Sequence, residues 1–357
     1  MDRPGARALR TSVAMTETAR VRRSLVSLLC FACLACHTRD SKSTPPPSEP
    51  PAQAEGDSAE APGFGPFAAP LHLDHPLVGR AWSMAEGAEL SRAELEARLQ
   101  AATHVLLGET HVHPDHHQLQ GAMIQALLDA GQRPAVAYEM LDPLQQSDID
   151  AFVASPERDP EAFAALVDWD NSGWPEWSLY RPAFAPALAA QLPLLAAQVP
   201  RSETKRYMSE GLGMLAPETV ARYGLDQPPP EATQAVLLDE MFVAHCEMVP
   251  REQLAPMVEI QRIRDARMAD AMLAGAAEHG RAVLVAGTGH TRAIGVPQLL
   301  ELGGVAPESI VSLGFVSVDP ERVEASDYGQ DFDLIVFTPE VESEDPCAAM
   351  REQAKGE

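Results

Sequence analysis

Six short apolar runs recur along the chain, and longer segments of mixed polar and apolar residues separate them. The runs are rich in Val, Leu, Ile and Ala and span residues 103–108, 134–139, 192–197, 281–287, 310–315 and 333–337. Runs of this length that are apolar at nearly every position are typical of strands buried on both faces of a parallel sheet. We therefore predict a mostly parallel sheet built from these six segments.

The segments between the runs carry the spacing of amphipathic helices. Residues 116–130 repeat apolar positions every three or four residues and stop before a glycine. Residues 182–190 and 260–277 are further predicted helices, whereas residues 206–256 contain helical patterns and no strand-like run. The sequence thus predicts an α/β fold, a mostly parallel sheet flanked by helices, with a small helical insertion domain that covers one edge of the sheet.

The first 36 residues have the pattern of a targeting signal. Three arginines within residues 20–23 precede an apolar run of 11 residues at 25–35, which is too short to span a bilayer and typical of a secretory signal peptide. The run ends in Leu-Ala-Cys, which is similar to a bacterial lipobox. We expect residues 1–36 to be a lipoprotein signal peptide with Cys36 as the lipidated residue; an ordinary cleaved signal is the alternative. The expected location is the bacterial cell envelope, on a membrane through the lipid anchor, and on the outer membrane in a Gram-negative cell.

Composition divides the rest of the chain. Residues 37–65 are rich in Pro, Ser, Glu and Ala and predict a solvated, disordered tether. Residues 66–350 are expected to form the folded domain, and residues 351–357 a short tail. The whole chain of 357 residues has 27 Lys and Arg against 52 Asp and Glu, a formal net charge of −25. A general nucleic-acid binder is excluded by this balance, because phosphates must be neutralised by cationic side chains.

Two four-residue motifs of the form Gly-x-x-His follow predicted strands. They are Gly108-Glu109-Thr110-His111 and Gly287-Thr288-Gly289-His290. In open α/β sheets, ligands bind at the carboxyl ends of the strands, and glycines there (Gly108, Gly287 and Gly289) let the backbone turn and approach a ligand closely. Because Glu139 closes a third predicted strand, we expect one crevice to be lined by Glu109, His111, Glu139 and His290.

Other candidate ligands lie nearby in sequence or in the insertion. His113 is expected at the rim of the crevice, and at least one of the adjacent residues His116 and His117 is expected to be solvated at the start of its helix. His245, beside Cys246, is a further donor for iron or zinc. In an oxidising envelope Cys246 and Cys347 are candidates for a disulfide, and the sequence leaves open whether they come within reach.

Charged residues crowd one predicted helix, at Arg262, Arg264, Asp265 and Arg267. A solvated helical face is the simplest interpretation, and a clamp for an anionic ligand is the alternative. The chain contains no Gly-x-Gly-x-x-Gly motif, Walker loop, Gly-x-Ser-x-Gly elbow or His-Glu-x-x-His motif. Nucleotide-binding, lipase-type and zincin functions therefore lack their usual signatures.

Four segments together resemble a known family. HVLLGETHVHPDHHQLQ, the strand ending YEM, IQRIRDARMADAML and VLVAGTGHTRAIGVPQLL are similar to the ChaN-like bacterial envelope lipoproteins of the haem-binding uptake/Tiki superfamily, which is related to TraB and erythromycin esterase-like proteins. The resemblance covers residues 75–340. It implies an α/β fold with a small helical domain, haem as the cofactor, and a part in haem or iron acquisition.

The resemblance also implies haem held between two subunits, and hence a homodimer, with a tyrosine and a histidine near the irons. The candidate tyrosines are Tyr180, Tyr207 and Tyr223, and the histidines that match are His111 and His290. We favour this haem-binding interpretation over an enzyme.

Two alternatives remain open at this point. The same superfamily holds metal-dependent proteases and esterases, which implies a hydrolase in which His111, His290 and a glutamate hold a divalent metal ion. Glu109 or Glu139 would then act as the general base toward a metal-bound water. The second alternative is a non-catalytic surface protein whose site has lapsed.

Overall fold

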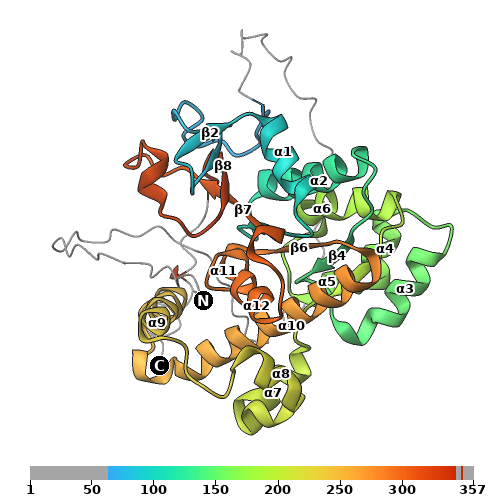
Figure 1. The fold of residues 1–357 in the computed structure, drawn as a ribbon, viewed down its shortest axis with the longest axis vertical. Helices are drawn as coiled ribbons and strands as arrows, with labels where there is room; N and C mark the ends of the chain where they lie inside the picture. The colour runs from blue at the N-terminus through green and yellow to red at the C-terminus, as the bar shows by residue number, and fades with distance from the viewer. Residues whose placement is uncertain (1–62, 343–346, 349–357) are drawn as a thin grey trace, which may run out of the picture.

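The computed structural model describes residues 63–342, 347 and 348, which form an eight-stranded sheet with helices on both faces (Figure 1). The strand order is β2-β1-β8-β7-β3-β6-β4-β5. From β8 to β5 every neighbouring pair is parallel, and β1 pairs antiparallel with β8 and with β2. The predicted α/β fold with a mostly parallel sheet is confirmed.

The strands are β1 Ala81–Ser83, β2 Ala88–Leu90, β3 His104–Glu109, β4 Ala135–Tyr138, β5 Leu194–Ala196, β6 Ala282–Gly287, β7 Ile310–Ser317 and β8 Leu334–Thr338. All six apolar runs are strands, within one or two residues of their predicted bounds. Strands β1 and β2, which lie beyond β8 at one side of the sheet, were not predicted. Each has only three residues, too few for a clear apolar run; β1 includes the polar Ser83, and the first two residues of β2 are exposed.

The helices are α1 Arg92–Ala101, α2 Pro114–Asp129, α3 Gln146–Ala154, α4 Pro160–Leu166, α5 Trp169–Ser172, α6 Trp177–Ala189, α7 Arg201–Glu210, α8 Pro217–Tyr223, α9 Glu231–Ala244, α10 Ala255–His279, α11 Thr288–Thr291 and α12 Val296–Leu302. Short 3-10 helices are η1 Pro143–Gln145, η2 Gly211–Met214, η3 Arg251–Gln253, η4 Pro307–Ser309 and η5 Ala325–Tyr328. Within the described ranges, no helix is both long enough and apolar enough to cross a membrane.

Alternate residues of the central strands face opposite sides of the sheet. Val105 and Leu107 of β3 pack with α2 and α6, and Leu106 between them packs with α10 and α12. All three side chains are fully buried. This double burial explains why the central strands are apolar at nearly every position, since neither face meets water.

The helical segment between β5 and α10 consists of α7, η2, α8, α9 and η3. It contains no strand, as the sequence predicted for residues 206–256, but its first helix begins earlier, at Arg201. Helix α9 packs against α10 (Figure 1). Two ties join α9 and its neighbours to the region after β6. Arg292 forms an ion pair with Glu240 of α9, and Ile294 packs on the apolar cluster under that helix.

The N-terminal boundary of the fold differs from the expected one. Phe64, placed by composition at the end of the tether, is 6% exposed and belongs to the main core. A single aromatic residue near the end of a polar stretch does not alter its composition, and its burial depends on contacts with the folded domain. The expected signal peptide, the lipidated Cys36 and most of the expected tether lie outside the described residues.

Candidate functional site

The two Gly-x-x-His motifs lie side by side at the carboxyl edge of the sheet. Glu109 and Gly287 are direct register partners, because β3 and β6 are parallel neighbours. Strand β6 pairs with β3 on one side and with β4 on the other. Glu139 directly follows β4, and the Glu139 backbone N–H donates to the carbonyl of Val285 in β6. The structure therefore brings the expected residues of both motifs and Glu139 together at one place.

Glu109 and His111 form a buried pair within the first motif. Their Oε1 and Nδ1 atoms are 2.5 Å apart. The imidazole meets the edge of Trp174, with ring centroids 4.9 Å apart, and reaches over Gly287, where an added Cβ would lie 2.9 Å from its Cε1 atom. Glycine at that position is thus required by the close approach of the ring. The second oxygen of Glu109, Oε2, is buried with no hydrogen-bond partner among the described residues.

Glu139 is the centre of a second group of ion pairs. Its Oε1 lies 2.5 Å from the guanidinium of Arg264 and 3.4 Å from Nε2 of His290. Its Oε2 accepts a hydrogen bond of 2.8 Å from the backbone N–H of Gly287. Nδ1 of His290 in turn lies 2.5 Å from Asp265 Oδ1. Glu139, Asp265 and His290 are all at most 5% exposed, so their charges are compensated by one another and by Arg264.

The ionisation of this group follows from its pairing. Burial opposes the charged form of His111, but the carboxylates of Glu109 and Glu139 outweigh it and raise its pKa to about 9. Burial likewise opposes charge on Glu139, yet His290 and Arg264 lower the pKa of its carboxyl group. Burial opposes charge on His290, but the carboxylate of Glu139 raises the pKa of His290. Burial also disfavours the ionised form of Asp265 and so raises its pKa. At neutral pH His111 is protonated, and a protonated imidazole offers no lone pair to a metal.

We expect protein stability to fall as the pH rises from 6.5 to 9. The folded-state pKa of His111, about 9, lies above its ordinary value of 6.5, so its contribution is complete below pH 6.5 and is lost as the pH rises through 9. The difference corresponds to a loss of up to about 3 kcal/mol. Chemical denaturation at pH 6, 7.5 and 9 measures it, and His111→Gln is expected to flatten the slope. An equally steep profile in the variant would contradict the assignment.

The three histidines that follow the first motif are all buried, contrary to the expected rim position of His113 and the expected solvation at His116 or His117. His113 binds the carbonyl of Pro339 through Nε2, at 2.9 Å, and stacks on His116 with centroids 3.7 Å apart. His113 and His116 bind residues at the end of β8 and just after it, and His117 packs on Tyr180; no local pattern reveals these contacts. Burial lowers the pKa of each, so they are neutral structural residues rather than exposed ligands.

The three candidate tyrosines lie in different places. Tyr180 on α6 is fully buried against His117, and its hydroxyl has no partner in the described part of the chain. Burial and the nearby Glu109 and Glu139 carboxylates raise its pKa. Tyr207 is buried beside Val199 and Ile263, and the Tyr223 hydroxyl donates to Asp270. Of the three, only Tyr180 therefore lies beside the residues that we call the strand-end group: Glu109, His111, Glu139, Arg264, Asp265 and His290.

Helix α10, on which the sequence places a cluster of charged residues, supplies part of the strand-end group. Arg264 and Asp265 point into the site, while Arg262 pairs with Glu259 on its own helix. Gln261, which sequence reasoning did not single out, lies 3.1 Å from Nδ1 of His290 through its amide nitrogen. The spacing of Gln261, Arg264 and Asp265 on one helical face is the signal that could have identified it.

The strand-end group resembles a network of ion pairs more than an open metal centre. Among the described residues, no cluster of three or more His, Cys, Asp or Glu side chains is arranged to hold a metal ion. The glutamates of the hydrolase alternative are engaged instead, Glu109 with His111 and Glu139 with Arg264. Gly108 allows Thr291 to pack closely against β3, since a Cβ at this position would lie 2.2 Å from the Thr291 hydroxyl. Gly289 lies within the short helix α11.

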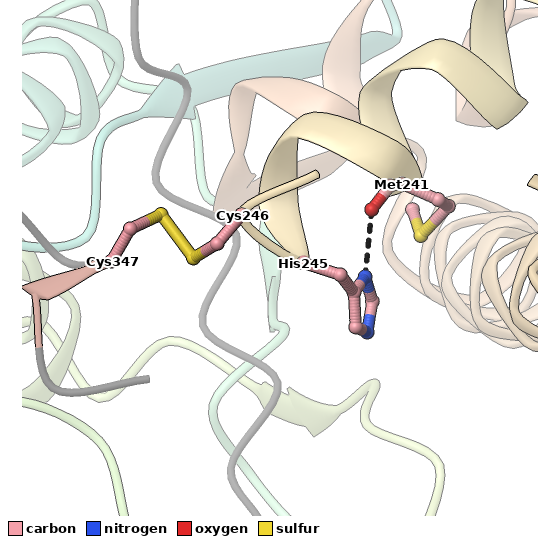
Figure 2. Close-up of a disulfide and its surroundings, with 4 residues drawn as sticks. All are labelled: Met241, His245, Cys246 and Cys347. Carbon is pink, nitrogen blue, oxygen red and sulfur yellow. Dashed lines mark hydrogen bonds between the residues drawn. A yellow bond between two sulfur atoms is a disulfide. The ribbon is translucent and has the colours of Figure 1, made fainter. Parts of the chain in front are cut away.

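His245 occupies a different environment, at the carboxyl end of α9. Its Nδ1 lies 2.7 Å from the backbone carbonyl of Met241, and Nε2 lies on the far side of the ring (Figure 2). Because a carbonyl only accepts, Nδ1 donates this hydrogen bond, and Nε2 is the ring nitrogen that remains outside it. The side chain is half-buried, and no described residue hydrogen-bonds to Nε2. Among the described residues His245 has no carboxylate partner, unlike His111 and His290, and its imidazole is already oriented.

The surroundings of His245 combine apolar surface with a cation. The exposed Met248 follows it by three residues, and Phe242 lies one turn before it on α9. The guanidinium of Arg251 lies 3.9 Å from the centroid of the Phe242 ring. The Arg251 side chain also pairs with Asp239 and is half-exposed. The next residue after His245, Cys246, forms a disulfide with Cys347, with the two Cα atoms 5.4 Å apart (Figure 2).

Comparison with known proteins matches this chain to one family. The family described as haem-binding uptake, Tiki superfamily, ChaN matches residues 95–300, which include both Gly-x-x-His motifs and His245. No curated protein matches the chain.

Several solved structures share parts of the fold. ChaN of Campylobacter jejuni, described as showing cofacial haem binding, is 23% identical, with 72% of this chain and 95% of that chain covered and a TM-score of 0.57. The type III effector HopBA1 is 13% identical, with 69% and 92% covered and a TM-score of 0.39. A mutant erythromycin esterase, EreC, in its open conformation is 12% identical, with 77% and 86% covered and a TM-score of 0.37. At these identities the ChaN structure supports the fold, and the other two carry no further argument.

Proposed function

Since the chain belongs to the haem-binding uptake family of the Tiki superfamily, ChaN, we propose that it binds haem and that His245 is an axial ligand of the iron. The family assignment supports the class of ligand. The single structural observation that supports this residue is the half-exposed imidazole of His245, whose Nδ1 is bound by the Met241 carbonyl while Nε2 remains available.

The residues around His245 suit the chemistry of haem. Histidines that bind metals almost always donate their other ring N–H to a carbonyl, carboxylate or water, which fixes the tautomer and the plane of the ring. The carbonyl of Met241 does this here. Phe242 and Met248 offer apolar contacts for a porphyrin face, and Arg251 offers a cation for a propionate.

Bound haem would supply an iron that an imidazole nitrogen can coordinate. The protein's part is to hold that nitrogen in place without a cost of reorganisation. The hydrogen bond from Nδ1 to Met241 prevents rotation of the His245 ring. The ion pair of Glu240 with Arg292 ties α9 to the region after β6, so the ligand is carried on an anchored helix.

The histidines of the Gly-x-x-His motifs are less suited to this role. His111 is paired with Glu109, and His290 lies between Asp265 and Glu139. Either side chain would have to give up a buried ion pair before it could bind iron, and that loss is costly. The strand-end group is better described as a charged network that supports the fold.

The proposal extends to the setting of the protein. The lipobox at Cys36 and the Pro-rich segment that follows support a lipid-anchored protein of the bacterial envelope, with a part in haem or iron acquisition. A homodimer that holds haem between its subunits is part of the same proposal. Sedimentation velocity with and without hemin tests the dimer, and metabolic labelling with palmitate, lost in Cys36→Ser, tests the anchor.

Titration of the purified protein with hemin tests the central proposal. We expect a saturable, red-shifted Soret band near one haem per chain. Iron-free protoporphyrin is expected to bind more weakly, because it lacks the metal that Nε2 would coordinate. Absence of a saturable band, with stoichiometric zinc, manganese or cobalt in the same sample, would overturn the haem-binding proposal.

A further inference from the structure

The disulfide beside His245 closes the turn that carries this ligand. We propose that the Cys246–Cys347 disulfide is a redox-sensitive clamp on the haem site, which keeps haem bound in an oxidising compartment and releases it when a dithiol reductant opens the bond. The inference rests on the proposed function, since it concerns the regulation of the site that His245 forms.

The backbone after His245 has an unusual conformation. Cys246 and Glu247 have φ angles of +59° and +60°, so two successive residues other than glycine lie in the left-handed region. L-residues seldom adopt this region, and such residues persist only where their surroundings hold them. A turn of this kind needs a restraint, and its loss allows the backbone to return to ordinary conformations.

At least two kinds of restraint act on the turn. Backbone hydrogen bonds run from Cys246 to Val243 and from Glu247 to Phe242, at 2.9 and 2.8 Å, and close the end of α9. The disulfide adds a covalent tie to Cys347, which lies 101 residues further along the chain and is 7% exposed. The first restraint belongs to the helix itself, whereas the second joins the turn to a distant segment and is the one that a chemical reaction can remove.

The position of the disulfide links it directly to the ligand. Cys246 directly follows His245 in the chain, and the Met248 N–H donates to the His245 carbonyl at 3.1 Å within the same turn. Relaxation of the turn therefore moves the His245 backbone relative to Met241, whose carbonyl orients the imidazole. The clamp thus controls the geometry of the ring, while Nε2 itself is chemically unchanged.

The redox step is an ordinary thiol–disulfide exchange. A thiolate of a dithiol reductant attacks the half-buried Cys246 sulfur, the bond to Cys347 breaks, and Cys347 leaves as a thiolate that takes up a proton. The second thiol of the reductant then displaces Cys246 from the mixed disulfide. Two electrons and two protons pass to the protein, and the reductant becomes a disulfide.

Porphyrin binding to the oxidised and reduced protein tests the clamp. Gallium(III) protoporphyrin is the probe, because its metal does not change oxidation state with the reductant and its fluorescence reports binding. We expect dithiothreitol to weaken binding by about tenfold, in line with the effect of losing the groups that orient a ligand. Cys347→Ser is expected to bind like the reduced protein with or without dithiothreitol.

Two further variants separate the clamp from general loosening. Glu240→Gln weakens the tie between α9 and Arg292 but leaves the disulfide intact, so it should keep the response to dithiothreitol. His245→Ala should bind weakly and show no response. Mass spectrometry of alkylated peptides verifies that Cys246 and Cys347 are reduced, and circular dichroism verifies that the protein stays folded.

The outcomes distinguish the two proposals. If the oxidised and reduced proteins bind the gallium porphyrin with equal affinity, and mass spectrometry shows that both cysteines were reduced, the clamp is overturned and haem binding is left intact. A response that persists in His245→Ala, or that disappears in Glu240→Gln, also overturns it. Failure of the oxidised protein to bind either hemin or the gallium porphyrin instead overturns the proposed function.

Discussion

Replacing His245 by alanine is expected to weaken hemin binding by roughly 100-fold, because loss of an orienting partner alone costs about 10- to 100-fold and this change removes the ligand itself. The imidazole has no other described role than its hydrogen bond to Met241, so the fold should be unaffected. A Soret titration of both proteins gives the two dissociation constants. The low-spin or high-spin signature of the ferric complex, read by electron paramagnetic resonance, reports the change of ligand independently.

Two control variants sharpen this comparison. His279→Ala removes an exposed histidine at the opposite end of α10 from α9 and should bind hemin like the parent. Tyr180→Phe removes a hydroxyl that is fully buried near Glu109 and should likewise have little effect on hemin affinity. If Tyr180→Phe lost the Soret band while His245→Ala kept it, the haem site would have to be placed at the strand ends.

Replacing Glu139 by glutamine should lower the free energy of unfolding by about 3–5 kcal/mol, the usual cost of removing one partner of a buried ion pair. The amide keeps the size of the side chain, but the charge that compensates Arg264 and His290 is lost. The Gly287 N–H also needs a new acceptor arrangement. Urea denaturation at pH 7, with the disulfide intact, measures the change.

An exposed ion pair provides the matched control. Glu161 pairs with Arg181 at the surface, and its change to glutamine should leave stability nearly as in the parent, because solvent screens such pairs. Where Glu139→Gln remains folded, it should still bind hemin, since Glu139 belongs to the strand-end group and His245 does not. A change of less than 1 kcal/mol in Glu139→Gln would show that the network does not support the fold as described.

The convergence of the two Gly-x-x-His motifs was predictable because parallel strands end at a common edge. Residues that follow such strands lie along that edge, and these meet because β6 lies between β3 and β4. The partners could not be predicted in the same way. That Glu139 pairs with Arg264, and His290 with Asp265, depends on where α10 crosses the sheet. Helical spacing indicated only that each of these two residues lies on the same side of the helix as Gln261, three and four residues before them.

The histidines after the first motif illustrate the opposite case. A proline, an aspartate and two histidines at a helix start are typical of an exposed surface, and His116 and His117 are nevertheless completely buried. Hydrogen bonds to residues more than 200 positions away account for His113 and His116, which contact Pro339 and Thr338. Burial of a polar side chain depends on whether distant partners satisfy it, and local sequence carries no record of those partners.

Local pattern was sufficient for the elements and their class, because the need to bury both faces of a parallel strand leaves an apolar run that can be read residue by residue. It also singled out both motifs, His245 and the two cysteines as chemically capable groups. Tertiary structure alone decided which of these groups are paired, buried or available. Contacts such as that between Cys246 and Cys347, 101 residues apart, arise from the packing of whole elements. Such contacts, and not the neighbours in the chain, decide whether a histidine joins an ion pair, lies in the core or keeps a ring nitrogen available.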